Sequence, residues 1–453
     1  MTTNTTEPVL QIRDALAHEY GDIYTAEAMA ALTFMARFND DQKRLMAERI
    51  GRRARRIQER QSIGFLDPAA TIPGTTIGVA DARAGKFVGS LIPGDLQRQW
   101  IQGTGPAAKP NAPIASSLRN VAYALLSGAD GWMFDGEDAL GQITAMSLDN
   151  QRSLKLAIGR DPLFLEVAGQ VAGEMNTWSR GFLGREIVTD WRAQLAFTTT
   201  IFRCRGLHLD DRHIRVQGRS LSAAIVDLTL YVVNNHLALT AAGASIVLYL
   251  PKIQTAGEAG FWNRLLTALE GHLGLAEGTI KAYVLIEQLE ATFQLMEIRA
   301  ALGLHFVGFN TGRWDYINSV SDANCWDSAF INPNIESVLM TYGYMRHYED
   351  RVRRAVNTPD ERGTFARGDV DRGAVRVEHD RPLLRGRVDH RRSGVRLDDA
   401  LGDVLHVRVL AGRELELPAI GVDSHHGTVR EAFAAGASRA SPAAIDGQSE
   451  TVN

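Results

Sequence analysis

The chain has 453 residues, of which 45% are hydrophobic and 23% are charged, and its formal net charge is −4. This composition is typical of globular proteins and provides no positive field for binding nucleic acid or an anionic membrane. Only Cys204 and Cys325 are present, which excludes a disulfide framework and a cysteine-rich zinc site. There is no apolar run of membrane-spanning length and no secretory signal in the polar start at 1–8, so we expect a cytoplasmic protein.

The first segment of the chain, residues 1–75, is predicted to be helical. Apolar residues such as Leu32, Met35 and Leu45 recur there at roughly helical spacing. The strongly basic run at 52–60 is interpreted as a solvated helix face rather than as an anion site. Proline and glycine then interrupt the pattern and mark the end of this segment.

Between residues 76 and 356, short apolar runs alternate with longer helical stretches. This alternation predicts an α/β fold with a parallel sheet, in the form of a TIM (β/α)8-type barrel. Only six strands are identified where a closed barrel needs eight, so we expect the barrel to be incomplete. The predicted strands are 100–103, 131–134, 200–203, 244–250, 280–286 and 304–309. The main helices are predicted at 222–242, 257–273, 289–302 and 334–356.

The C-terminal region, residues 357–453, differs in composition from the rest of the chain. From residue 361 onward it contains no lysine, tryptophan or tyrosine and is rich in Arg, Gly, Asp, Ala and Val. So few aromatic side chains make it difficult to build a hydrophobic core. Two explanations stay open: a disordered extension, or the out-of-frame translation of a GC-rich gene.

Ionisable or polar residues follow each strand of the predicted sheet. In a parallel α/β barrel the carboxyl ends of the strands meet at one face, where the catalytic loops converge. Any one such residue is weak evidence, because acidic residues at strand ends often only cap helices. Several together predict a site at this face. The residues are Asp135, Glu137, Arg203, Lys252, Glu287 and the run 311–315.

The mixture of side chains at this face indicates the kind of ligand. Several carboxylates without a cysteine or histidine cluster favour a hard cation such as Mg²⁺, which binds oxygen ligands. An arginine at the same face suits an anionic substrate, because its planar guanidinium pairs with a carboxylate through two hydrogen bonds. The residues therefore predict a site that polarises a carbonyl group in a small carboxylate.

The stretch GFNTGRWDYI at 308–317 resembles the signature of the malate synthase family, with Phe309 in place of the more common leucine. Further blocks resemble the family in the same order along the chain, so that the resemblance covers about residues 30–356. These blocks are IPGDLQRQWIQGTGP at 92–106, SGADGWMFDGEDA at 127–139, FRCRGLHL at 202–209, LYLPKIQ at 248–254 and IKAYVLIEQ at 280–288.

This resemblance implies an acyltransferase of the glyoxylate bypass that condenses acetyl-CoA with glyoxylate and releases malate and CoA. It implies a Mg²⁺ ion held by Glu287 and Asp315. Arg203 matches the family arginine that stabilises the developing enolate oxygen and contacts glyoxylate. These implied roles agree with Lewis-acid polarisation and a fixed positive charge near the oxyanion.

The resemblance also assigns roles around the metal. The backbone N–H groups of Gly312, Arg313, Trp314 and Asp315 would hold glyoxylate. The acidic block that contains Asp135 and Glu137 would support the water shell of the metal. Nothing in the sequence indicates the oligomeric state.

One departure from the family keeps three functions open. In the family, a C-terminal helical domain supplies the aspartate that removes a proton from acetyl-CoA, and the block that carries it has no counterpart here. Without a base, such a step slows by about 10²–10⁴-fold. The resemblance therefore leaves three hypotheses: a malate synthase, a malyl-CoA or citramalyl-CoA lyase-like enzyme, or a catalytically dead protein that binds Mg²⁺ and a 2-oxo acid.

Overall fold

A computed structural model of the chain describes residues 9–98, 100–102, 111–137 and 145–369. Nearly all of the predicted C-terminal region therefore lies outside the described residues. The chain divides into two compact units, and every described residue belongs to the first, Met1–Val409. Within the described ranges, no helix combines the length and the apolar character that a membrane crossing requires.

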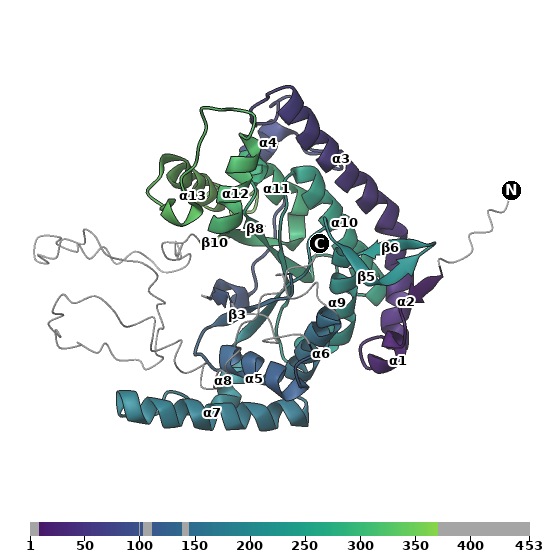
Figure 1. The fold of residues 1–453 in the computed structure, drawn as a ribbon, viewed down its shortest axis with the longest axis vertical. Helices are drawn as coiled ribbons and strands as arrows, with labels where there is room; N and C mark the ends of the chain where they lie inside the picture. The colour runs from purple at the N-terminus through teal and green to yellow at the C-terminus, as the bar shows by residue number, and fades with distance from the viewer. Residues whose placement is uncertain (1–8, 99, 103–110, 138–144, 370–453) are drawn as a thin grey trace, which may run out of the picture. The chain divides into compact units, whose positions relative to one another are not determined.

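The centre of the described fold is a sheet of seven parallel strands in the order β10-β9-β8-β7-β4-β3-β2 (Figure 1). The outermost strands of this sheet, β2 and β10, do not pair with each other, so the described strands form an incomplete barrel, as predicted. The strands are β2 (Trp100–Gln102), β3 (Gly131–Asp135), β4 (Thr199–Arg203), β7 (Ile246–Leu250), β8 (Ile280–Ile286), β9 (Phe306–Thr311) and β10 (Arg367–Asp369).

The sheet contains the six predicted strands and one more. The additional strand, β10, lies beyond residue 356 in the stretch assigned to the C-terminal region, and Arg367 pairs with Gly308 of β9. Its sequence, Arg-Gly-Asp, has no apolar run, so hydrophobic patterning does not reveal it. Gly308 permits the pairing, because a Cβ atom there would lie 2.2 Å from the carbonyl oxygen of Arg367.

Helices connect the strands, as expected for parallel crossovers. The predicted helices at 222–242 and 257–273 are confirmed within one residue at each end, and the other two begin later than predicted. The helices after β2 are α5 (Ile114–Leu125), α6 (Met146–Ile158), α7 (Pro162–Leu183), α8 (Trp191–Phe197), α9 (Ala223–Ala241), α10 (Ala256–Leu273), α11 (Leu295–Leu302), α12 (Arg313–Ala323) and α13 (Gly343–Val356).

The N-terminal segment is mostly helical, as predicted, but it also contains a strand. Its elements are β1 (Leu10–Ile12), α1 (Leu16–Glu19), α2 (Ala26–Met35) and α3 (Asn39–Gln58), and α4 (Val79–Arg83) follows just after it. β1 pairs antiparallel with β5 (Asp210–Val216), which continues into β6 (Arg219–Ser222), so these three strands form a small second sheet. This pairing joins segments about 200 residues apart, so a reading of local patterns does not find it.

Two hydrophobic cores position the sheet. A small cluster fills the interior of the curved sheet, and a much larger one lies between the sheet and the surrounding helices. The interior cluster consists of Leu96, Met133, Ile201, Val247, Tyr249, Tyr283, Leu285 and Val307. Because side chains alternate along each strand, filling the interior fixes which residues reach the carboxyl face.

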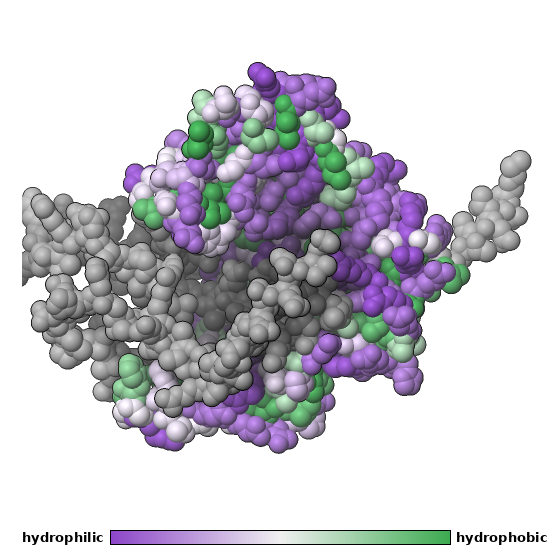
Figure 2. Space-filling model, viewed as in Figure 1, coloured by the Kyte–Doolittle hydropathy of each residue, from purple (hydrophilic) through white to green (hydrophobic). Residues whose placement is uncertain are grey.

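Helix α3 contacts elements near the carboxyl face of the sheet. It contacts β6 and α12, and the surface along it is mostly hydrophilic (Figures 1 and 2). The basic run at 52–60 is not simply solvated, because several of its arginines form ion pairs with acidic side chains. Arg52 pairs with Glu258 at 3.3 Å and Arg56 with Glu290 at 2.6 Å. The helix therefore ties together the loops that follow β7 and β8.

Candidate active site

Arg203 lies at the centre of the acidic cluster formed by the strand ends. Its guanidinium contacts Asp135 at 3.2 Å and Glu137 at 2.8 Å, and Glu287 lies 3.8 Å away. All four side chains are at least nine-tenths buried. The pairing of Asp135 with Arg203 in the β3–β4 register brings the first contact about. The convergence predicted from the strand ends is thus present for these four residues.

The acidic turn after β3 needs a glycine. The N–H group of Gly136 donates to the carbonyl oxygen of Arg203 at 2.9 Å, and a Cβ atom at this position would lie 2.6 Å from the ring of Phe202. The N–H group of Glu137 donates to the carboxylate of Asp135 at 3.1 Å. The close approach of the backbone to β4 directs both carboxylates of this turn at the arginine.

Lys252 joins the two carboxylates predicted to bind metal. Its ammonium lies 3.1 Å from Glu287 and 2.5 Å from Asp315, and its backbone N–H donates to the other oxygen of Glu287 at 2.7 Å. Lys252 follows β7, Glu287 follows β8 and Asp315 lies in the first turn of α12. Three consecutive strands therefore direct their charged side chains at one point.

Burial and charge shift the pKa values of these groups in different directions. Burial raises the pKa of Glu287 to about 7, although the charges of Lys252 and Arg203 oppose this. Burial also acts to raise the pKa of Asp315, but hydrogen bonds from Lys252 and Glu287 outweigh it and lower the value. Burial acts to lower the pKa of Lys252, but the charges of Glu287 and Asp315 outweigh it. The pKa of Lys252 is therefore raised and the amine stays charged.

The predicted glyoxylate-binding run is the start of a helix. Helix α12 begins at Arg313, with Gly312 as its N-cap residue. The first N–H groups of a helix have no partner within that helix, so those of Arg313, Trp314 and Asp315 are available to an anion. Gly312 must lack a side chain, because a Cβ atom there would lie 2.8 Å from the Cβ atom of Glu287.

Two residues of the predicted run already have partners. The N–H group of Gly312 donates to the carbonyl oxygen of Ile286 at 3.1 Å and to the hydroxyl of Tyr348 at 2.7 Å. The guanidinium of Arg313 donates to the carbonyl oxygen of Val338 at 2.6 Å and, within the described part of the chain, forms no ion pair with the acidic cluster. The backbone N–H of Gly312 is therefore used to hold the start of α12 against β8 and α13.

Trp314 also turns away from the cluster. Its side chain is 51% exposed, and the guanidinium of Arg313 stacks over its ring at 4.7 Å from the centroid. Tyr348 of α13 was not identified from the sequence, although its hydroxyl joins Ile286 at the end of β8 to Gly312 at the start of α12. Its only sequence signal is a place on the apolar face of an amphipathic helix, which does not distinguish it from an ordinary core residue.

The donor set at this point fits a divalent cation. The carboxylates of Glu287 and Asp315 both reach the position of the Lys252 ammonium, and carboxylate oxygens are what Mg²⁺ prefers. Among the described residues, no group of three or more His, Cys, Asp or Glu side chains is arranged to hold a metal. These side chains permit a site in which Glu287 and Asp315 are the two protein ligands and water or substrate oxygens are the others.

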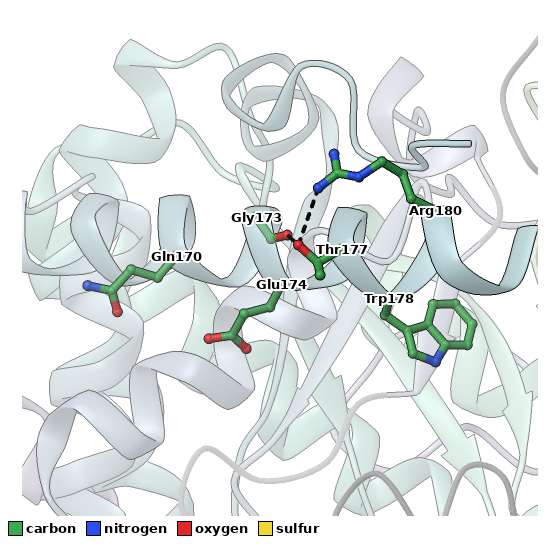
Figure 3. Close-up of a pocket in the computed structure, with 6 residues that line it drawn as sticks. All are labelled: Gln170, Gly173, Glu174, Thr177, Trp178 and Arg180. Atoms are coloured by element: carbon green, nitrogen blue, oxygen red, sulfur yellow. Dashed lines mark hydrogen bonds between the residues drawn. The ribbon is translucent and has the colours of Figure 1, made fainter. Parts of the chain in front are cut away.

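A separate depression lies along α7, with a volume of about 740 Å³ (Figure 3). Its charged groups have intramolecular partners: Glu174 pairs with Arg119 at 2.5 Å, and Arg180 pairs with Glu186. It is lined by Gln170, Gly173, Glu174, Thr177, Trp178 and Arg180. None of these residues belongs to the acidic cluster, so the carboxyl face is the stronger candidate for chemistry.

Comparison with known proteins relates this chain to one family. Residues 199–380 match the family model of the malate synthase TIM-barrel domain. Malate synthase A of Escherichia coli (strain K12) is 30% identical over 359 residues, covering 78% of this chain and 60% of that protein.

Two further relatives give the same picture. The malate synthase of Streptomyces clavuligerus is 31% identical over 75% of this chain and 57% of its own length. The glyoxysomal malate synthase of Zea mays is 29% identical over 79% of this chain and 58% of its own length. The chain thus spans well under two thirds of the length of these relatives.

Proposed function

Because residues 199–380 match the malate synthase TIM-barrel model, we propose that the chain condenses acetyl-CoA with glyoxylate and that water then hydrolyses the resulting malyl thioester to give malate and CoA, a reaction of the glyoxylate bypass. The observation that carries this proposal is the convergence of Arg203, Glu287 and Asp315 on one small volume at the carboxyl face. These groups suit a two-carbon oxo acid, whose carboxylate and carbonyl oxygens need cationic and N–H partners.

Glu287 and Asp315 would hold Mg²⁺, which when bound polarises the carbonyl group of glyoxylate. The free N–H groups in the first turn of α12 would bind its carboxylate. These donors belong to a helix that packs into the fold. At the preceding position, 312, any side chain is excluded because its Cβ atom would be too close to Glu287. The substrate carbonyl would therefore be oriented by rigid elements rather than by a mobile loop.

Arg203 would stabilise the negative oxygen that develops on acetyl-CoA. Asp135 and Glu137 hold two nitrogens of its guanidinium, while Nε has no hydrogen-bond partner among the described residues. Arg203 is 6% exposed as a residue, so its charge acts in a poorly solvated site where electrostatic stabilisation is strong. Asp135 and Glu137 therefore hold the guanidinium of Arg203 in place before the reaction begins.

Binding of Mg²⁺ and a 2-oxo acid without catalysis is the second candidate function. The acidic block that provides the catalytic base in the family is not matched in this chain, and the described sheet has seven strands. A protein with this half of the site would bind Mg²⁺ and a small 2-oxo acid without condensing them. Activity and binding must therefore be measured separately.

The test is the release of CoA from acetyl-CoA and glyoxylate in the presence of Mg²⁺, followed with a thiol reagent. CoA release that requires glyoxylate and disappears in Arg203→Met supports the condensation. Glyoxylate binding by calorimetry without CoA release identifies the binding protein. Formation of glyoxylate from malyl-CoA, without the condensation, assigns the chain to the lyase alternative.

A further inference from the structure

Lys252 is the residue of this site for which the proposed reaction has no use. Its ammonium lies 2.5 Å from Asp315 and 3.1 Å from Glu287, and it is 17% exposed. An amine that forms a Schiff base must lose its proton. The ammonium of Lys252 instead contacts two carboxylates, so the side chain acts as a charge and not as a nucleophile.

The ammonium occupies the position that a divalent ion would need. Among the described residues, Lys252 is the cation that contacts both Glu287 and Asp315, through one nitrogen atom, while Arg203 lies 3.8 Å from Glu287 alone. Oxygen ligands of Mg²⁺ lie at about 2.0–2.1 Å from the ion. An ammonium and a magnesium ion therefore cannot both lie in contact with this pair of oxygens.

The backbone of Lys252 is fixed by its neighbours. Its φ angle is 57°, a left-handed conformation that is rare for residues other than glycine. The N–H group is held by Glu287 at 2.7 Å, and the carbonyl oxygen accepts from Arg49 of α3 at 2.8 Å. Strain of this kind persists only when the surroundings fix the residue.

We propose that Lys252 is the internal counter-ion of the metal site: its ammonium fills the gap between Glu287 and Asp315 in the metal-free protein and leaves when a divalent cation binds. The inference rests on the proposed function only in taking Glu287 and Asp315 as the metal ligands. It adds that this chain balances their charge itself and that metal binding must displace the lysine.

The charges of the cluster agree with this exchange. Four carboxylates, Asp135, Glu137, Glu287 and Asp315, face two cations, Arg203 and Lys252. When every group is ionised, the cluster therefore has two more negative charges than positive ones. Exchanging the ammonium of Lys252 for a divalent ion reduces this excess from two negative charges to one, so the ion balances the cluster better than the lysine does.

The test uses the full chain and magnesium chloride alone, titrated by calorimetry. Lys252→Met and Lys252→Gln should each bind Mg²⁺ about tenfold more tightly than the wild type, because no ammonium competes for the carboxylates. Lys43→Met is the matched control: Lys43 pairs with Asp210, outside the cluster. Its removal should leave the affinity within about twofold of the wild type.

Unchanged or weaker binding in both Lys252 variants, with binding lost in Asp315→Asn, overturns the counter-ion role and leaves the metal site standing. Absence of binding in the wild type and in all variants overturns the metal site and the inference together. A measurement on the wild type covers the case in which the variants do not fold. Mg²⁺ should then increase the labelling of Lys252, but not of Lys43, by an amine-reactive reagent, and an unchanged or reduced rate contradicts displacement.

Discussion

Arg203 and Arg205 lie two residues apart and are both buried, yet their surroundings differ. Arg203 faces the acidic cluster with its Nε unpaired among the described residues. Arg205 faces the opposite way and pairs with Asp227 through two of its nitrogens, at 2.9 and 2.7 Å, and with Asp211 at 2.7 Å. The guanidinium of Arg203 can still donate a hydrogen bond to a ligand oxygen, whereas that of Arg205 is held within the framework.

The different surroundings of Arg203 and Arg205 show how a structural buried arginine can be distinguished from one that is available to a ligand. The carboxylate of Asp227 also accepts from the backbone N–H of Arg205, and that of Asp211 accepts from the N–H of His213. This group of three, the Arg205 triad, joins the end of β4 to α9 and β5. A buried ion pair with all its hydrogen bonds satisfied fixes structure, and an open one is available to a substrate.

The largest expected effect comes from breaking the Arg205 triad. Asp227→Ala leaves the buried guanidinium short of partners and should lower the free energy of unfolding by about 3–5 kcal/mol. The control is Asp22→Ala, which removes the exposed partner of Arg152 and should cost about 1 kcal/mol or less. Urea denaturation of both variants checks this, and equal losses would remove the distinction between the two kinds of ion pair.

The corresponding substitution at the other arginine, Arg203, is Arg203→Lys. A lysine keeps the charge but cannot contact Asp135, Glu137 and a ligand oxygen with one planar group. We expect CoA release to fall by about 10²–10³-fold and the free energy of unfolding to fall by less than in Asp227→Ala. Initial rates at saturating glyoxylate, together with urea denaturation, measure both quantities. A variant that is as active as the wild type would argue that Arg203 only neutralises the carboxylates.

The smallest effect concerns pH. Burial acts to raise the pKa of Asp211, but the charge of Arg205 and the N–H of His213 outweigh it and lower the pKa below its ordinary value of 3.8. A carboxyl group with a lowered folded pKa stabilises the protein above its unfolded pKa, and this stabilisation is lost as pH falls through the folded value. The difference in unfolding free energy between wild type and Asp211→Asn should therefore be largest near about pH 6 and shrink below about pH 4. A difference that does not change with pH would exclude an ionised Asp211.

Much of the fold and the acidic cluster could be predicted from the sequence, for a physical reason. The predicted strands contain apolar runs, and the charged residues at or directly after their ends, such as Arg203 and Glu287, must reach one face of a parallel sheet. What the sequence did not show depends on contacts between distant segments. The pairing of β1 with β5 and the addition of β10 are of this kind, and so is the hydrogen bond from Gly312 to Tyr348.

Residue roles inside the run 311–315 were harder to predict than its location. The motif indicates a ligand-binding turn, but the structure shows that this turn opens a helix, which directs Asp315 to the cluster and Arg313 to Val338. The role of Lys252 was hidden for a similar reason. Its importance comes from where two other strands place their carboxylates, and no local pattern contains that information.

The account depends most on Glu287, Asp315 and Arg203 sharing one small ligand through a divalent ion. Calorimetric titration of glyoxylate into the wild type and Asp315→Asn, each with and without Mg²⁺, tests this directly. We expect the wild type to bind glyoxylate only when Mg²⁺ is present, and Asp315→Asn to lose this Mg²⁺-dependent binding while keeping the wild-type melting temperature. Binding of equal strength in the variant, or binding that does not respond to Mg²⁺, would contradict the account.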